Sequence, residues 1–217
     1  LAMACSRLGQ AADAMLAAES LREPVASMPL AQWVRAAVKG DTWASDPSSG
    51  WTISDNAELL DLGCERAIWA IRVGMPALGE QIINNMLARA ERLQDEPLAW
   101  YLQAYLQHLQ AKDDAARQSM GTAASLPRNN QLPSYPEWSE VLHWALRANP
   151  SDPKPHAYLA PLEYWLTQSD EAIAHWQNLL STSGDADSTI HYGLAMALWE
   201  ARNDRPAAAR ILAEALN

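Results

Sequence analysis

The sequence of 217 residues contains no Phe, two Cys and nine Gly. Phosphate-binding loops and dinucleotide-binding turns need Gly at fixed spacings, and neither motif occurs in this Gly-poor chain. Cys5 and Cys64 lie far apart and form no metal-binding spacing. Two such cysteines favour free thiols in a reducing compartment, although the sequence leaves a single disulfide open.

Histidine is also scarce, and none of the five His falls in an HxxxH or HExxH pattern. The five are His108, His143, His156, His175 and His191. Because they come from successive predicted helices, some could meet in space. The sequence alone predicts no metal ion, no cofactor and no catalytic residue, since a nucleophile elbow is absent as well. We therefore expect that the chain by itself is not an enzyme.

Basic residues are few: 16 Lys and Arg stand against 26 Asp and Glu, and the net charge is -10. This balance argues against nucleic-acid binding, which needs a basic stripe, and against docking on anionic lipid. No apolar run approaches the roughly 18 residues that span a membrane. The first residues lack the basic start of a signal peptide. We expect a cytoplasmic piece of a longer protein, with any targeting signal outside this sequence.

Strand signals are nearly absent, whereas Ala, Leu, Gln, Glu and Arg favour helices. Helical periodicity predicts a series of helices separated by turns rich in Gly, Pro, Ser and Asp. The predicted helices cover about 2–20, 29–38, 56–73, the stretch from the turn at 74–76 to 93, 98–110, 114–125, 137–148, 156–167, 170–181, 189–202 and the residues from 205 onward. The segment 39–55 is predicted to be irregular.

An internal repeat runs through these helices. Leu159, Ala160 and Tyr164 recur 35 residues later as Leu194, Ala195 and Trp199, and Ala172, Trp176 and Leu179 recur 36 residues later as Ala208, Leu212 and Ala215. A weaker copy contains Leu102, Leu106, Ala116, Met120 and Ala123. In each copy a small residue early in the second helix permits close approach, and a large residue four positions later fills the gap. One such unit cannot bury both faces, so the units must stack.

This small–large pattern resembles tetratricopeptide repeats (TPR). The resemblance implies an all-α fold, in which stacked antiparallel helix pairs form a right-handed superhelix. We divide the chain into a degenerate N-terminal region, 1–55, and one continuous array, 56–217. The units of the array are expected at 56–94, 97–127, 153–184 and 188–217, with a bridging helix at 137–148. Asp113, Ser169 and Asp204 are expected just before the second helices, as caps.

Residues 135–180 also resemble a segment of large bacterial repeat proteins. Those proteins carry an N-terminal β-sandwich module related to sugar-mutarotase-like folds. The matching features are Trp138 to Leu146, Asn149-Pro150, Tyr158-Leu159, Tyr164 and EAIAHW at 171–176. The resemblance implies a role in carbohydrate metabolism. One departure is Pro161, where such families commonly have Asn. Because a Pro inside a helix costs about 3 kcal/mol, we expect a kink there or a helix that begins near Pro161.

The candidate binding surface lies on the first helix of each pair, which lines the concave face of such arrays. Its expected partner-binding residues are Lys154, Ala157, Pro161, Tyr164, Trp165 and Trp199. Ala157 and Pro161 exclude the Lys, Arg and Asn pattern of repeats that bind acidic C-termini. Tyr164, Trp165 and Trp199 could instead form an aromatic groove for an apolar helix or a sugar ring, unless they pack between repeats.

Glu163 and Glu200 occupy nearly equivalent positions on neighbouring first helices. Two facing carboxylates can perform glycosidase chemistry, but nothing in the sequence orients this pair, so we expect solvated charges. The favoured function is a non-catalytic scaffold that binds another protein, or another domain of the same chain. The alternative is a carbohydrate-associated module whose aromatic residues contact glycan. A spacer between domains, and a dimer through the C-terminal helix, also stay open.

Overall fold

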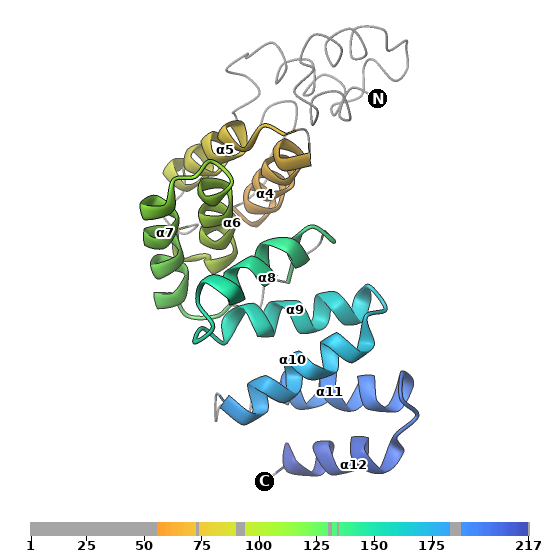
Figure 1. The fold of residues 1–217 in the computed structure, drawn as a ribbon. Helices are drawn as coiled ribbons and strands as arrows, with labels where there is room; N and C mark the ends of the chain where they lie inside the picture. The colour runs from red at the N-terminus through yellow and green to blue at the C-terminus, as the bar shows by residue number, and fades with distance from the viewer. Residues whose placement is uncertain are drawn as a thin grey trace, which may run out of the picture. The chain divides into compact units, whose positions relative to one another are not determined.

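The computed structural model describes residues 56–72, 74–89, 94–129, 132–133, 135–182 and 188–216. These residues form nine α-helices joined by turns, and no strand occurs among them (Figure 1). Each helix packs against a neighbour in the chain. The predicted all-α fold of packed neighbouring helices is therefore confirmed among these residues. The helices and the irregular segment predicted for residues 1–55 lie outside the described residues.

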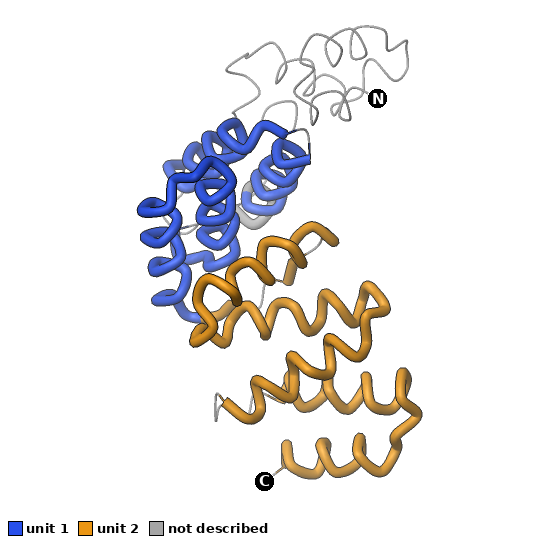
Figure 2. The backbone as a smooth tube through the Cα atoms, in the orientation of Figure 1, with its two compact units in different colours: residues 1–127 blue, residues 128–217 orange. Residues whose placement is uncertain are grey.

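The chain divides into two compact units, Leu1–Pro127 and Arg128–Asn217 (Figure 2). The first unit contains α4 (Asn56–Arg72), α5 (Pro76–Arg89), α6 (Pro97–His108) and α7 (Asp113–Ser125). Helix α5 contacts both α4 and α6, and α6 contacts α7. The predicted single array over 56–217 stays a prediction.

Glycine permits the close packing of α5. A Cβ atom at Gly79 would lie 2.7 Å from Leu106 Cδ2 and 3.1 Å from the carbonyl oxygen of Ala67. The first contact would force the Leu106 side chain to move, and the second is tight against backbone, so a larger residue would require α5 and its neighbours to shift. Gly74 turns the chain between α4 and α5 with a φ of 76°, a conformation without steric cost only for Gly.

A hydrogen-bonded carboxylate ties α5 to the end of α6 and the start of α7. Lys112 Nζ lies 2.6 Å from Glu80 Oε2, and the side-chain amides of Gln110 and Gln107 donate to the two Glu80 oxygens over 2.9 and 3.3 Å. Burial opposes ionisation, but the hydrogen bonds from Lys112, Gln110 and Gln107 outweigh it and lower the pKa of Glu80. This carboxylate is well satisfied.

Cys64 lies inside α4 and is 5% exposed, with a free thiol. Burial, followed by the nearby charges of Asp61 and Glu96, raises the pKa of the thiol. The thiol therefore stays protonated and packs as a small apolar side chain.

The second unit contains α8 (Trp138–Ala148), α9 (Lys154–Trp165), α10 (Ser169–Thr182), α11 (Ser188–Glu200) and α12 (Arg205–Glu214). Each of these helices packs against the next, and α9 also contacts α11. The apolar core between α9 and α12 is built from Ala, Ile and Leu side chains around the large Trp176. Trp176 and Ile190 of this core also line a cavity.

The small–large pattern is largely confirmed by burial. The small residues are all buried: Ala116, Ala172 and Ala208. Trp176 and Met120 are buried as well, with 5% and 6% exposure. Leu212 does not fill the predicted gap: it is 41% exposed, because no described helix follows α12 to cover it.

Two expectations about helix starts need correction. Asp204 does cap α12, and its carboxylate accepts a hydrogen bond from the Ala207 N–H at 3.0 Å. Asp113 and Ser169 are instead the first residues of their own helices. A late start of α9 near Pro161 is also wrong, because the helix begins at Lys154 and continues through Pro161. The packing of α9 against α8, α10 and α11 offsets the hydrogen bond that this Pro removes.

Candidate functional site

The second unit contains a cavity of about 270 Å³. It is lined by Tyr158 and Pro161 of α9, Trp176 of α10, Ile190 and Gly193 of α11, and Arg128 and Asn129 ahead of α8. This volume falls just below the roughly 300 to 1,000 Å³ of sites that enclose a whole small ligand. The cavity therefore has room for about one large side chain.

Gly193 shapes one wall of this cavity. A Cβ atom at this position would lie 2.6 Å from Cζ2 and 2.7 Å from Cε2 of the Trp176 indole. The indole of α10 therefore lies directly against the backbone of α11. Close backbone approach, rather than a left-handed φ, explains the Gly at this place in the middle of a helix.

The hydroxyl of Tyr164 connects α9 with α11 by donating a hydrogen bond to Glu200 Oε2. The Tyr164 ring meets the Trp176 ring with centroids 5.8 Å apart and planes at 60°, an edge-to-face contact. The hydrogen bond to Glu200, followed by burial, raises the pKa of Tyr164 to about 12. Tyr164 therefore packs beside the cavity and keeps its proton at neutral pH.

Three large aromatic side chains of α9 and α11 face solvent. Trp165 is 66% exposed, Trp199 is 52% exposed and Tyr192 is 61% exposed. The Arg205 guanidinium lies over the Trp199 ring, 6.0 Å from its centroid, at the range of a cation–π contact. Tyr192 was missed by the sequence analysis. Tyr192 lies seven residues before Trp199, so both lie on one face of α11. This spacing could have indicated Tyr192 from the sequence.

The six expected partner-binding residues thus occupy different settings. Ala157 and Pro161 line the cavity. Trp165 and Trp199 lie at the surface, whereas Tyr164 is half-buried. Lys154 lies at the start of α9, where its Nζ is 3.1 Å from Asp152 Oδ1. Partner binding by these residues stays a prediction.

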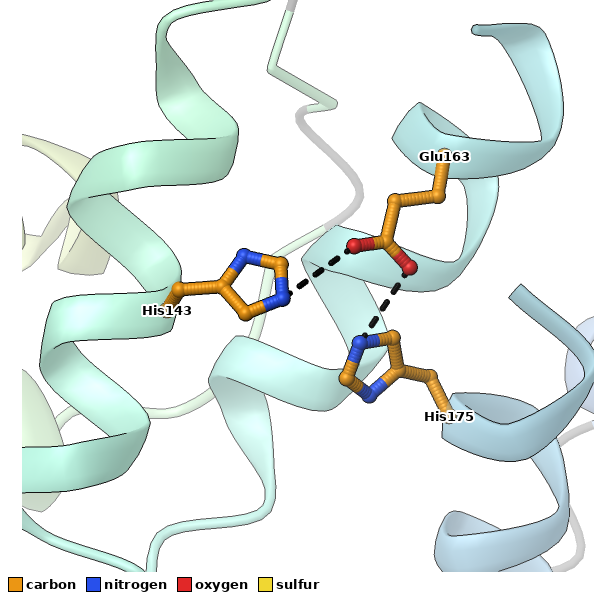
Figure 3. Close-up of side chains that lie close together, drawn as sticks. All are labelled: His143, Glu163 and His175. Atoms are coloured by element: carbon orange, nitrogen blue, oxygen red, sulfur yellow. Dashed lines mark ion pairs between the residues drawn. The ribbon is translucent and has the colours of Figure 1, made fainter. Parts of the chain in front are cut away.

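A second feature is a cluster of His143, Glu163 and His175 (Figure 3). His143 comes from α8, Glu163 from α9 and His175 from α10. Nε2 of His143 lies 3.4 Å from Glu163 Oε1, and Nε2 of His175 lies 3.2 Å from Glu163 Oε2. The side chains are 40%, 1% and 13% exposed for His143, Glu163 and His175. The cluster is therefore buried at the carboxylate and open to solvent beside His143.

The expectation of solvated charge at Glu163 is wrong, because the side chain is buried against α8 and α10. Glu200, its near-equivalent in the repeat, is exposed and accepts the hydrogen bond of Tyr164. The two glutamates therefore have different surroundings, and they offer no pair of solvated carboxylates.

His156 adds a third imidazole behind His175. The Nδ1 atoms of His156 and His175 are 2.5 Å apart, and the ring centroids are 4.8 Å apart. Burial, followed by His175, lowers the pKa of His156, although Glu163 opposes this shift. No linear spacing indicates this cluster, because its members are brought together by helix packing alone.

Comparison with known proteins adds little to this description. No protein-family model matches the chain, and no curated protein matches it. Among solved structures, the chain is similar to one described as the crystal structure of MamA. The identity is 13% and the TM-score 0.38, over 85% of this chain and 92% of that one. A likeness this distant contributes nothing to the functional argument. Among the described helices, none is long and apolar enough to cross a membrane.

Proposed function

We propose that the chain is a non-catalytic scaffold, and that its second unit binds an apolar protein segment with basic flanks. The segment belongs to another protein or to another domain of the same chain. The observation that carries the proposal is the exposure of Trp165, Tyr192 and Trp199 on the first helices of successive pairs. Exposed aromatic residues in such numbers are typical of binding surfaces, where Trp and Tyr supply much of the affinity.

The cavity lined by Pro161 and Trp176 adds an anchor point to this surface. Trp165 follows Pro161 by one helical turn, so both lie on the same face of α9. A bound segment that inserts one large side chain into the cavity can therefore contact Trp165 with its next turn.

The net charge of the second unit favours a bound segment with basic residues beside its apolar anchors. Residues 128–217 contain eleven acidic and six basic side chains, a formal net charge of -5. A segment with Lys or Arg beside its apolar anchors would be attracted to this surface, whereas an acidic segment would be repelled.

A display library of random peptides, selected on the immobilised full chain, tests this proposal. We expect enrichment of peptides with apolar anchors and basic flanks. In the variant Trp165→Ala/Trp199→Ala, their affinity should fall at least about tenfold, as for aromatic residues central to an interface. Trp100→Ala is the matched control, because Trp100 lies in α6 of the other unit. Failure to enrich any peptide that depends on Trp165 or Trp199 would overturn the proposal.

The second candidate is glycan binding, which the same two indoles favour because an exposed Trp ring can stack on a sugar ring. It agrees with the resemblance of residues 135–180 to carbohydrate-associated repeat proteins. Titration with an oligosaccharide panel, followed by Trp fluorescence, distinguishes the two. A saturable change that is lost in Trp165→Ala, together with no enriched peptide, would favour glycan.

A further inference from the structure

Three successive helices of the second unit place ligand-type side chains around one point. One ligand atom from each of His143, Glu163 and His175 lies within 4.8 Å of the other two. Figure 3 shows the two imidazoles approaching the Glu163 carboxylate from opposite helices. The question is what compensates this carboxylate, since a buried ionised group without a partner is costly.

Hydrogen bonding does not fully compensate it. Among the described residues, none donates a well-formed hydrogen bond to Oε2 of Glu163, although His175 Nε2 is 3.2 Å away. The groups that form ion-pair distances with Glu163 are both imidazoles, which are charged only when doubly protonated. The carboxylate therefore keeps the capacity to bind a cation.

The orientation of His143 points to the same conclusion. Its Nδ1 lies 2.8 Å from the carbonyl oxygen of Ser139. A carbonyl oxygen can only accept, so Nδ1 carries the proton. In the neutral ring Nε2 then presents a lone pair to Glu163 Oε1 across 3.4 Å. Two acceptors facing each other need a positive charge between them, which either a second proton on the ring or a bound metal ion supplies. A backbone carbonyl that fixes the ring in this way is the usual partner of a metal-bound His.

His156 holds the ring of His175 in the way that the Ser139 carbonyl oxygen holds the ring of His143. The 2.5 Å between their Nδ1 atoms leaves room for a single proton. With that proton on His175, its Nε2 lone pair faces Glu163 and His156 acts as the outer acceptor. Both rings of the cluster can therefore present Nε2 as a ligand while Nδ1 is held by a neighbour.

We propose that His143, Glu163 and His175 bind one divalent transition-metal ion, with Zn²⁺ as the best match. Two imidazole nitrogens and one carboxylate are a common ligand set of zinc sites that keep a fourth, solvent-filled position. Ligand atoms about 2.0 to 2.1 Å from a tetrahedral zinc lie roughly 3.3 Å from each other. The separations of 3.4 Å from His143 to Oε1 and 3.2 Å from His175 to Oε2 are close to that value. The full set of three ligand atoms spans up to 4.8 Å, so binding one ion would draw the side chains slightly closer together. Mg²⁺ and Ca²⁺ prefer oxygen ligands and fit less well.

The site is open to solvent on the side of His143. The side chain of His143 is 40% exposed, so an ion can enter from solvent and a water molecule can complete its coordination. The bound ion would join α8, α9 and α10, and would thereby stabilise the second unit. The sequence predicts no metal site, and this inference departs from that prediction because it depends on a juxtaposition of three helices.

The test uses the full chain, stripped of metal with a chelator and titrated with Zn²⁺ and with Co²⁺ as separate probes. We expect one ion per chain by calorimetry, and visible absorption typical of four-coordinate Co²⁺ that Zn²⁺ displaces. Glu163→Gln, His143→Asn and His175→Asn should each weaken binding at least about tenfold, and His156→Asn should weaken it less. His108→Asn is the matched control, since His108 is an exposed residue at the end of α6.

Circular dichroism of each metal-free variant separates loss of the site from loss of the fold. His143→Asn keeps the test decisive even if a buried variant unfolds, because His143 is only half-buried. The proposal is overturned if the parent chain takes up no stoichiometric ion. It is also overturned if folded Glu163→Gln and His143→Asn bind as tightly as the parent, or if His108→Asn weakens binding to the same extent.

Discussion

Glu80 of the first unit and Glu163 of the second are both removed from most of the solvent, with 13% and 1% of their side chains exposed. Their surroundings differ in kind. Glu80 accepts hydrogen bonds from one ammonium and two amide groups, whereas two imidazoles face Glu163. Because these donors always carry their protons, their hydrogen bonds to Glu80 hold α5 against the end of α6 and the start of α7. Imidazoles can instead present lone pairs, so Glu163 and its neighbours can form a ligand set.

The two units also differ in the groups that pack against a glycine within a helix. In the first unit, Gly79 admits an aliphatic side chain and a backbone carbonyl. In the second unit, Gly193 admits the rigid indole of Trp176, which also lines the cavity. In the second unit, this close contact of Gly193 with the indole thus lies directly beside a cavity. Substitutions there should have larger and more specific effects than in the first unit.

The largest effect is expected from Trp176→Ala. Removing a buried Trp should lower the free energy of unfolding by about 3 to 5 kcal/mol, because the packing around the existing cavity cannot close over the lost ring. Met120→Ala is the equivalent change in the first unit. Urea unfolding of both variants measures the difference. A smaller loss for Trp176→Ala than for Met120→Ala would contradict the central role of the indole.

Gly193→Ala should cost about 1 to 3 kcal/mol, since the added methyl group overlaps the Trp176 ring. Gly121→Ala is the control: no atom lies within 4 Å of a Cβ at that position, so the helix should gain up to about 1 kcal/mol. In a Trp176→Ala background the cost of Gly193→Ala should vanish. A cost that persists in the double variant would show that another contact is responsible.

The two glutamates can be compared directly through Glu80→Gln and Glu163→Gln in the presence of chelator. Glu80→Gln should lose about 1 kcal/mol, since it removes charge-assisted hydrogen bonds at a partly solvated site. Glu163→Gln should cost nothing measurable, because the metal-free carboxylate is incompletely satisfied. A loss at Glu163 equal to that at Glu80 would indicate that protonated histidines already pair with it.

The contribution of Glu80 should also depend on pH. Its pKa is lower in the folded chain than the usual value of 4.5. The stabilisation is therefore present above that value and is lost as pH falls through the lower, folded pKa. Urea unfolding in acid should show the parent and Glu80→Gln converging. Curves that stay parallel would contradict this assignment.

The smallest effect is expected for exposed ion pairs in either unit. Arg202 bonds Asp170 at 2.8 Å, but the two side chains are 47% and 77% exposed. Asp170→Asn should change stability by less than about 1 kcal/mol. Asp114→Asn, which breaks the exposed pair with Arg117 in the first unit, should have no measurable effect. A larger loss of stability for Asp170→Asn than for Asp114→Asn would show that exposed ion pairs, and not only interior contacts, distinguish the second unit from the first.

The sequence by itself determined the helices over the described residues, their pairing and the burial of Ala116, Ala172 and Ala208. These features follow from local periodicity, from turn residues and from the recurrence of small and large side chains. All three can be read directly from the sequence. The continuation of α9 through Pro161 was not determined in this way. It depends on neighbouring helices that offset a local cost.

Only the tertiary structure decided that Glu163 is buried and that His143 and His175 approach it. The three residues belong to three helices, and neither their spacing nor their type indicates convergence. Their meeting depends on the angle and distance at which α8, α9 and α10 pack, which small side chains such as Ala172 permit. The approach of these three side chains is a property of that packing, whereas helix formation is a property of the local sequence.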